Sequence, residues 1–116
     1  MIKVLETSRE LTKVEQYKMT LGREITVLKD VPDGTMIEVD AYCKYIDVKD
    51  DGKEVELLSI LDRDGQVYSC QSATFRHSFE DICDIMMDGD AVGTFSIKKI
   101  SGVTKAGRPF IDCALV

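Results

Sequence analysis

The sequence predicts a mainly β protein in which five short antiparallel strands curl into a Greek-key barrel, with one helix between strands three and four. Three observations predict it. One ten-residue stretch alternates between apolar and polar residues, and turn signals separate four further short apolar segments. Between the third and fourth predicted strands, one segment has apolar residues three and four positions apart, as in a helix. Five short strands hide their two sheet edges most readily when the sheet closes.

The first three predicted strands follow one another through tight turns. Strand one, residues 36–46, comes after the turn signal Pro32-Asp33-Gly34 and places its apolar residues at alternate positions, which predicts one buried face. Asp50-Asp51-Gly52 leads to strand two, residues 55–61. Asp64-Gly65 is a strong hairpin signal and leads to strand three, residues 66–71. The three strands form an antiparallel meander.

The next segment changes from strand to helix spacing. Ser72 or Thr74 caps a predicted helix that Gly89 ends, and one stripe of this helix is apolar: Phe75, Phe79, Ile82, Cys83 and Met86. Strand four is predicted at 91–100. A glycine-containing loop at 101–108 joins it to strand five at 110–116.

Residues 1–34 are predicted as an N-terminal extension to the barrel, which spans 35–116. Thr7 or Ser8 caps a helix that contains Leu11, Val14, Tyr17 and Leu21, and residues 24–28 form a strand or a second short helix. A chain of 116 residues suits one domain. The order strand, strand, strand, helix, strand, strand is that of an OB-like fold.

Composition and charge narrow the class of protein. The chain is 44% hydrophobic and 31% charged, as in soluble globular proteins, and has no apolar run that approaches the roughly 20 residues of a membrane span. We therefore expect a cytoplasmic protein that contacts no membrane. The net charge is −6, with 0 in residues 1–34, −9 in 35–90 and +3 in 91–116. The basic last quarter permits a localised anionic partner.

The sequence does not favour an enzyme, a metal site or a cofactor. The four cysteines lack ligand spacing and stand among apolar residues, which predicts free, buried thiols. The single histidine, His77, has no plausible nucleophile beside it. The aspartates near residues 50 and 64 flank glycine turns, where Asp is preferred for its own backbone hydrogen bonds.

A binding function is better supported, because aromatic and basic residues fall together on the elements that line the cleft of an OB barrel. Tyr42 and Lys44 are predicted to lie on the face of strand one opposite the core. Exposed rings stack on bases, and cations meet phosphates. The candidate nucleic-acid-binding residues are Tyr42, Lys44, Tyr68, Arg76, Lys98, Lys105, Arg108 and Phe110.

Several segments resemble a known family, the small single-stranded-DNA-binding proteins encoded by tailed phages of Gram-positive bacteria. The resemblance is carried by Arg9–Thr12, Tyr17–Thr20, Leu58–Ile60, Asp64–Tyr68, Gln71–Phe75, Phe79–Ile82 and Thr104–Ile111. It implies an OB-like fold that coats single strands during phage DNA replication or recombination in the host cytoplasm. Phage replication or recombination proteins are the further partners that it implies.

The leading hypothesis is therefore a non-enzymatic, sequence-tolerant single-stranded-DNA binder that is a monomer or a small homo-oligomer. A protein-interaction module that binds a host or phage enzyme through its acidic surface is the alternative. A small accessory or virion protein without a ligand is the third.

Overall fold

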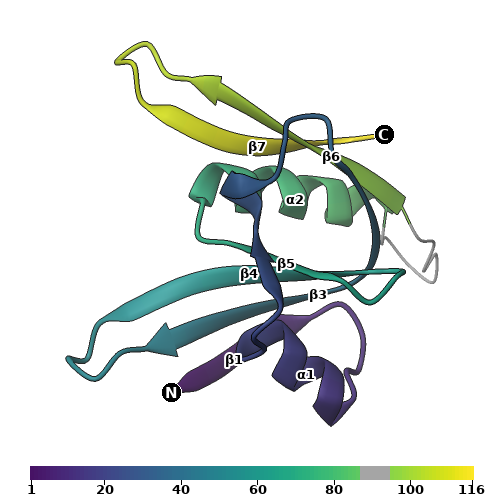
Figure 1. Ribbon diagram of the computed structural model, residues 1–116, viewed down its shortest axis with the longest axis vertical. Coiled ribbons are helices and arrows are strands. Elements are labelled where there is room, and N and C mark those ends of the chain that lie inside the picture. The colour runs from purple at the N-terminus through teal and green to yellow at the C-terminus, as the bar shows by residue number, and fades with distance from the viewer. Residues whose placement is uncertain (87–94) are drawn as a thin grey trace.

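A computed structural model describes residues 1–86 and 95–116 of the chain. In those residues it contains one curled sheet of seven strands and two α-helices (Figure 1). The strands are β1 (Ile2–Thr7), β2 (Ile25–Val27), β3 (Met36–Val48), β4 (Glu54–Asp62), β5 (Val67–Cys70), β6 (Phe95–Val103) and β7 (Pro109–Leu115). The helices are α1 (Lys13–Thr20) and α2 (Ala73–Met86), and a 3₁₀ turn, η1, spans Leu28–Asp30.

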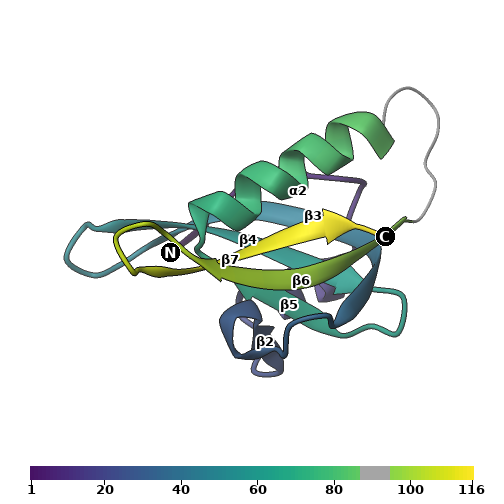
Figure 2. The ribbon, with the colours of Figure 1, turned by 90° about the horizontal axis from the view of Figure 1, so that it is seen from above.

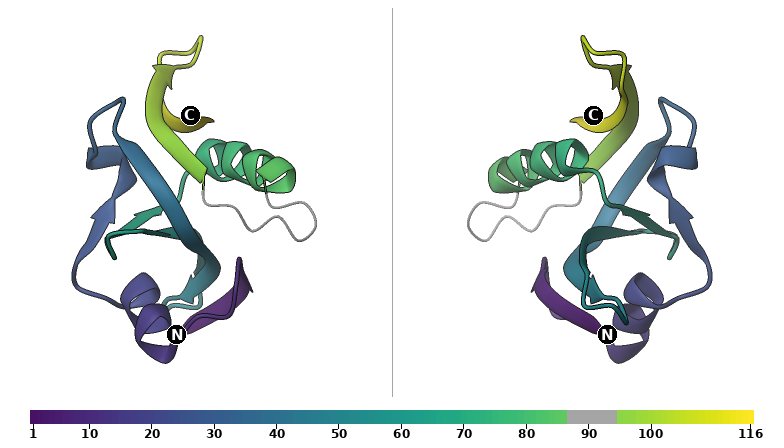
Figure 3. Two further views of the ribbon diagram at one scale, coloured as in Figure 1. Left: turned by 90° about the vertical axis from the view of Figure 1, so that its right-hand side faces the viewer. Right: turned by 90° about the vertical axis from the view of Figure 1, so that its left-hand side faces the viewer.

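The long strand β3 organises the sheet, whose order is β2-β5-β4-β3-β6-β7, with β1 also paired to β3. The first residues of β3, Met36 to Val39, pair with β6, while its later residues pair with β4 on one edge and β1 on the other. Strand β3 thus belongs both to the β4–β5 part of the sheet and to the β6–β7 hairpin. The sheet bends along β3 between these two parts and curls, as Figure 3 shows.

The predicted order of elements over residues 35–116 is present as β3, β4, β5, α2, β6 and β7. The prediction of five strands is wrong, because β1 and β2 add two strands from residues 1–34 to the same sheet. The described part of the sheet is also open. Its terminal strands are β2 and β7, and β2 pairs in parallel with β5.

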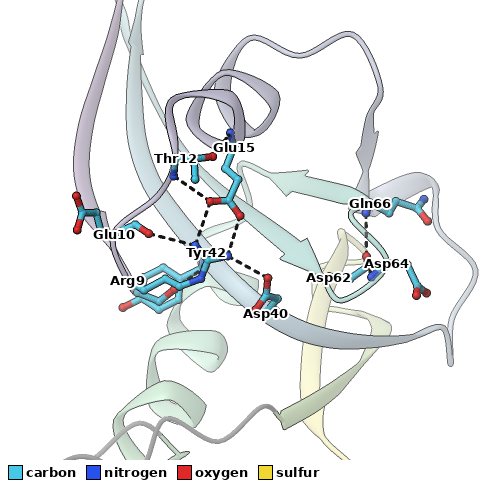
Figure 4. A network of polar contacts seen from close by, with 10 residues as sticks. Arg9, Glu10, Thr12, Glu15, Asp40, Tyr42, Asp62, Asp64 and Gln66 are labelled. Atoms are coloured by element: carbon cyan, nitrogen blue, oxygen red, sulfur yellow. Dashed lines mark hydrogen bonds and ion pairs between the residues drawn. The ribbon is translucent and has the colours of Figure 1, made fainter.

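The turn between β4 and β5 is fixed by the hairpin signal that the sequence carries. Gly65 has a φ of +87°, a left-handed conformation that glycine adopts without steric cost. The Asp62 carboxylate accepts hydrogen bonds from the backbone N–H groups of Asp64 at 2.9 Å and Gln66 at 2.8 Å (Figure 4). Aspartate at this turn therefore has the backbone role predicted for it.

Helix α2 covers one face of the sheet, as Figure 2 shows. Ser72 caps it, since its Oγ accepts a hydrogen bond from the Phe75 N–H at 3.2 Å. Phe75 and Phe79 are fully buried, and the Phe79 ring meets the Tyr42 ring edge-on, with 5.5 Å between centroids. The predicted core stripe of this helix is confirmed at Phe75, Phe79 and Cys83. Gly89, its predicted end, lies outside the described residues.

A second, smaller core lies where the opposite face of β3 meets α1. It contains Met19 of α1 together with Ala41, Cys43 and Tyr45 of β3. A register shift between Val39 and Ala41 changes which face successive residues occupy. Tyr42 therefore lies with Ile37 and Val39 in the main core, and β3 is covered on both faces. The prediction of a strand with one exposed face is wrong for this part of β3.

The N-terminal segment begins its helix later than predicted. Thr12, and not Thr7 or Ser8, caps α1 in a capping box with Glu15. Arg9 donates two hydrogen bonds to the Glu15 carboxylate, at 2.8 and 3.1 Å, and one to Asp40 of β3 at 3.0 Å (Figure 4). This network ties the start of α1 to the sheet.

Two boundaries in the last quarter also differ from those predicted. Strand β6 continues to Val103 and β7 begins at Pro109, so the connecting loop is confined to residues 104–108. The beginning of predicted strand four, residues 91–94, lies outside the described residues. All four cysteines are free and buried, which confirms the prediction made from their apolar neighbours. No helix in the described residues is long and apolar enough to cross a membrane.

Candidate nucleic-acid interface

Two β-hairpins project from the same side of the molecule, β3–β4 and β6–β7 (Figures 1 and 2). A groove of about 760 Å³ lies between the β4–β5 part of the sheet and the β6–β7 hairpin. We call it the hairpin groove. Its lining residues are Val27, Lys29, Leu57, Ser69, Cys70, Gln71, Ser72, Lys99, Ser101, Pro109, Phe110 and Ile111.

Phe110 is the aromatic residue of the hairpin groove. It is partly buried, and it pairs across the β6–β7 ladder with Gly102. The ring lies against this glycine, where a Cβ atom would come within 2.6 Å of Phe110 Cζ. The absence of a side chain at Gly102 therefore leaves the space that the ring occupies. Of the eight candidate residues, Phe110 is the one that lines the groove directly.

Basic residues stand in and near the groove. Lys29, just after β2, is exposed and lines the groove. Lys99 of β6 also lines the groove but is buried. Lys105 and Arg108 are exposed on the loop at the tip of the β6–β7 hairpin. Lys98 is also exposed, but alternation along β6 places its side chain on the face opposite to that of Lys99. The described lining residues include two lysines and no carboxylate, although the buried Lys99 is paired with Asp33 at 2.9 Å from outside the lining.

The two tyrosines among the candidates are buried. Tyr42 and Tyr68 are each 7% exposed and belong to the main core. Burial raises the pKa of Tyr42 to about 12, and its hydroxyl donates a hydrogen bond to Glu6 at 3.2 Å. The expectation that Tyr42 lies on an exposed face is therefore wrong, because α2 packs over that side of β3 through Phe79.

Two of the candidate cations are neutralised by neighbouring carboxylates. Lys44 lies 2.9 Å from both Glu6 of β1 and Glu80 of α2, so it joins three elements. Arg76 of α2 lies 3.2 Å from Glu56 of β4. Both side chains are mostly buried. Neither residue is among those that line the hairpin groove.

Sequence reasoning missed Lys29 and Lys99, which line the groove. Lys29 follows a three-residue strand that no alternation marks. Lys99, however, carries a signal, since it continues the apolar face that Phe95 and Ile97 begin on β6. A lysine at a core position of a strand must meet a partner, because an unpaired buried charge is costly. Its presence there points to a polar site at the edge of the core.

Comparisons with known proteins indicate the family to which the chain belongs. Residues 3–116 match the family model described as phage single-stranded DNA-binding protein. Two relatives are the single-stranded DNA-binding proteins of Bacillus phages phi29 and PZA. Each is 33% identical over 90 residues, which cover 75% of this chain and 72% of the relative. No solved structure matches the chain. The chain belongs to the family of phage single-stranded DNA-binding proteins.

Proposed function

We propose that this protein binds single-stranded DNA without sequence preference, in the hairpin groove, during phage DNA replication or recombination. Phe110 stacks on a base, and the cations around the groove meet the phosphates. The observation that carries the proposal is the aromatic side chain of Phe110 in a groove that also holds Lys29 and Lys99. Base stacking on a ring within a positive groove is how sequence-tolerant single-strand binders work.

We further propose that residues 35–116 form an OB-like unit and that residues 1–116 act as one DNA-binding domain. OB folds bind oligonucleotides on their second and third strands and through the loops that join strands one to two and four to five. The corresponding elements are β4, β5 and the loops at 49–53 and 104–108. Leu57 of β4, Ser69 of β5 and Phe110 of β7 all line the groove, which supports this correspondence.

The charge distribution supports local contacts between a few cations and DNA phosphates, and not a general electrostatic attraction between the whole protein and DNA. Residues 35–90 carry −9, a sum that already counts the bases paired with Glu38, Glu56 and Glu80, so this part of the chain repels DNA. The last 26 residues carry +3. We therefore assign the phosphate contacts to Lys29 and to the exposed candidates Lys105 and Arg108, and not to Lys98, which lies on the face of β6 opposite to the groove. Non-specific attraction by the whole molecule is weak at a net charge of −6.

Fluorescence anisotropy of a labelled oligothymidine, titrated with protein at several salt concentrations, tests this function. We expect saturable binding whose logarithm of affinity falls linearly with the logarithm of salt concentration, since phosphate contacts release counterions. An unlabelled mixed-sequence strand is expected to compete as well as oligothymidine, and a duplex much less well. Absence of saturable binding at micromolar protein and low salt would contradict the proposal and favour a protein-interaction module.

A further inference from the structure

The ammonium group of Lys99 is held in an oxygen-lined site at the edge of the hairpin groove. Its side chain is 5% exposed, and its Nζ donates to the Val31 carbonyl oxygen at 2.8 Å and to Asp33 Oδ1 at 2.9 Å. The second oxygen of Asp33, Oδ2, accepts a hydrogen bond from Ser101 Oγ at 2.5 Å. One carboxylate thus binds an ammonium and a hydroxyl, both from residues that line the groove.

This arrangement has the chemistry of a site for a phosphate oxyanion. A DNA phosphate, like a carboxylate, offers two anionic oxygens, and an ammonium beside a hydroxyl binds either group by charge-assisted hydrogen bonds. Lys99 and Ser101 are two residues apart on β6, so their side chains lie on the same face of the strand. Lys29 lines the same groove and adds a second positive charge.

Asp33 can leave this site without unfolding the segment that carries it. Its side chain is 56% exposed, in contrast to that of Lys99. The backbone around it is anchored independently, because the Gly34 N–H donates to the Lys99 carbonyl oxygen at 2.7 Å and the Lys99 N–H donates to that of Thr35 at 2.9 Å. Rotation of the Asp33 side chain therefore breaks its two contacts and leaves the turn in place.

We propose that Lys99 and Ser101 form a phosphate-binding site of the hairpin groove, and that the Asp33 carboxylate occupies this site as an internal competitor that a phosphate of bound single-stranded DNA displaces. The inference rests on the proposed function and adds one phosphate contact to it. It also assigns a role to Asp33, which tunes affinity downward. Exchange of one anion for another keeps the buried ammonium neutralised throughout, so neither state leaves an unpaired buried charge.

The variant Asp33→Asn tests this exchange, because the amide keeps the size of the side chain and loses its charge. We expect it to bind oligothymidine at least threefold more tightly than wild type at low salt. The slope of log affinity against log salt is expected to stay that of wild type, since the same phosphate meets Lys99 in both complexes. Asp84→Asn, on the exposed side of α2, removes the same charge away from the groove and is the matched control.

The double variant Asp33→Asn/Lys99→Met is expected to lose the gain, since the ammonium that would meet the phosphate is gone. A measurement on the wild-type protein does not depend on the folding of any variant. The ¹³Cγ resonance of Asp33 is expected to shift on saturation with oligothymidine, as the carboxylate leaves Lys99 and Ser101. An unchanged Asp33 resonance in the complex, or an Asp33→Asn affinity equal to that of Asp84→Asn, would overturn the inference while DNA binding itself stands. No binding by wild-type protein would overturn both.

Discussion

The ring of Phe110 lies over Gly102 on the neighbouring strand, so closely that a Cβ atom at Gly102 would stand 2.6 Å from Phe110 Cζ. This pairing holds the ring at the wall of the hairpin groove, at the start of β7 and two residues after the basic loop 104–108. An aromatic side chain held in this way is pre-organised for a planar ligand. Little side-chain entropy remains to be lost when a base stacks on it.

Replacement of Phe110 by alanine is expected to weaken oligothymidine binding by about 1–3 kcal/mol, because a stacked base loses its platform. The dependence of affinity on salt is expected to stay unchanged, since no phosphate contact is removed. Anisotropy titrations at several salt concentrations measure both quantities. Phe110→Tyr keeps a ring and is the control, and a loss of affinity as large in Phe110→Tyr as in Phe110→Ala would argue against stacking.

Replacement of Lys105 and Arg108 together by alanine, unlike that of Phe110, is expected to change the dependence of affinity on salt concentration. Each phosphate contact on a single strand contributes about 0.7 to the salt slope, so the double variant should flatten it by roughly one to one and a half units. Binding should weaken most at low salt. Lys13→Ala, at the start of α1, removes a positive charge away from the groove and is the comparison. Wild-type affinity of the double variant at every salt concentration would remove these residues from the site.

Helix α2 is expected to stabilise the fold and not to read DNA. Phe79 is fully buried against Tyr42, Phe75 and Phe95, so Phe79→Ala should lower the free energy of unfolding by about 3–5 kcal/mol. Ile85→Ala, at a side chain of the same helix that is 75% exposed, should change it by less than about 0.5 kcal/mol. Urea denaturation measures both. A Phe79→Ala protein of normal stability with weakened DNA binding would contradict this role.

The Arg9–Glu15 pair is expected to make stability depend on acid pH. Hydrogen bonds from Arg9 and from the Thr12 backbone hold the pKa of Glu15 down at about 2. A carboxyl whose pKa is lower in the folded than in the unfolded state stabilises the fold above its unfolded pKa, and this contribution is lost as the pH falls towards the folded pKa. The stability difference between wild type and Glu15→Gln should therefore shrink as the pH falls from about 5 to about 2.

Urea denaturation at successive pH values measures that difference. Glu10→Gln removes a carboxylate from an exposed neighbouring position and is the control (Figure 4). A difference between wild type and Glu15→Gln that stays constant over this pH range would show that the pair shown in Figure 4 does not hold the start of α1.

The sequence allowed prediction of β3, β4, β5 and α2 because each is defined by a local pattern. Period-two alternation, the Asp64-Gly65 turn and the stripe at Phe75 and Phe79 act over a few residues each. Strand β1 carries no such pattern, and at residues 24–28 the sequence indicates only a strand or a short helix, where the structure has β2 followed by the 3₁₀ turn η1. The middle residues of β1 are exposed on both faces, and β2 is a three-residue strand paired in parallel with β5, about forty residues away. Backbone pairing over that distance leaves little trace in composition.

The same limit explains the misplaced candidate residues. Alternation alone assigns Tyr42 to the face opposite Ala41 and Cys43, which is correct, but it does not reveal that α2 covers that face. Lys44 and Arg76 are cations whose partners come from other elements, so only the tertiary structure shows that they are paired. Phe110, Lys105 and Arg108 lie near one another in the structure as the sequence predicts, because a hairpin is local and its ends and its loop are close in sequence.

Photo-cross-linking tests most directly the claim that single-stranded DNA lies in the hairpin groove. An oligothymidine with 5-iodouracil in place of several thymines, bound to the wild-type protein at low salt and irradiated, couples to aromatic side chains on which its bases stack. Mass spectrometry then identifies the cross-linked peptide. We expect coupling at Phe110, and its loss in Phe110→Ala. Efficient coupling at Tyr17 of α1, which is 54% exposed and away from the groove, with none at Phe110, would contradict the account.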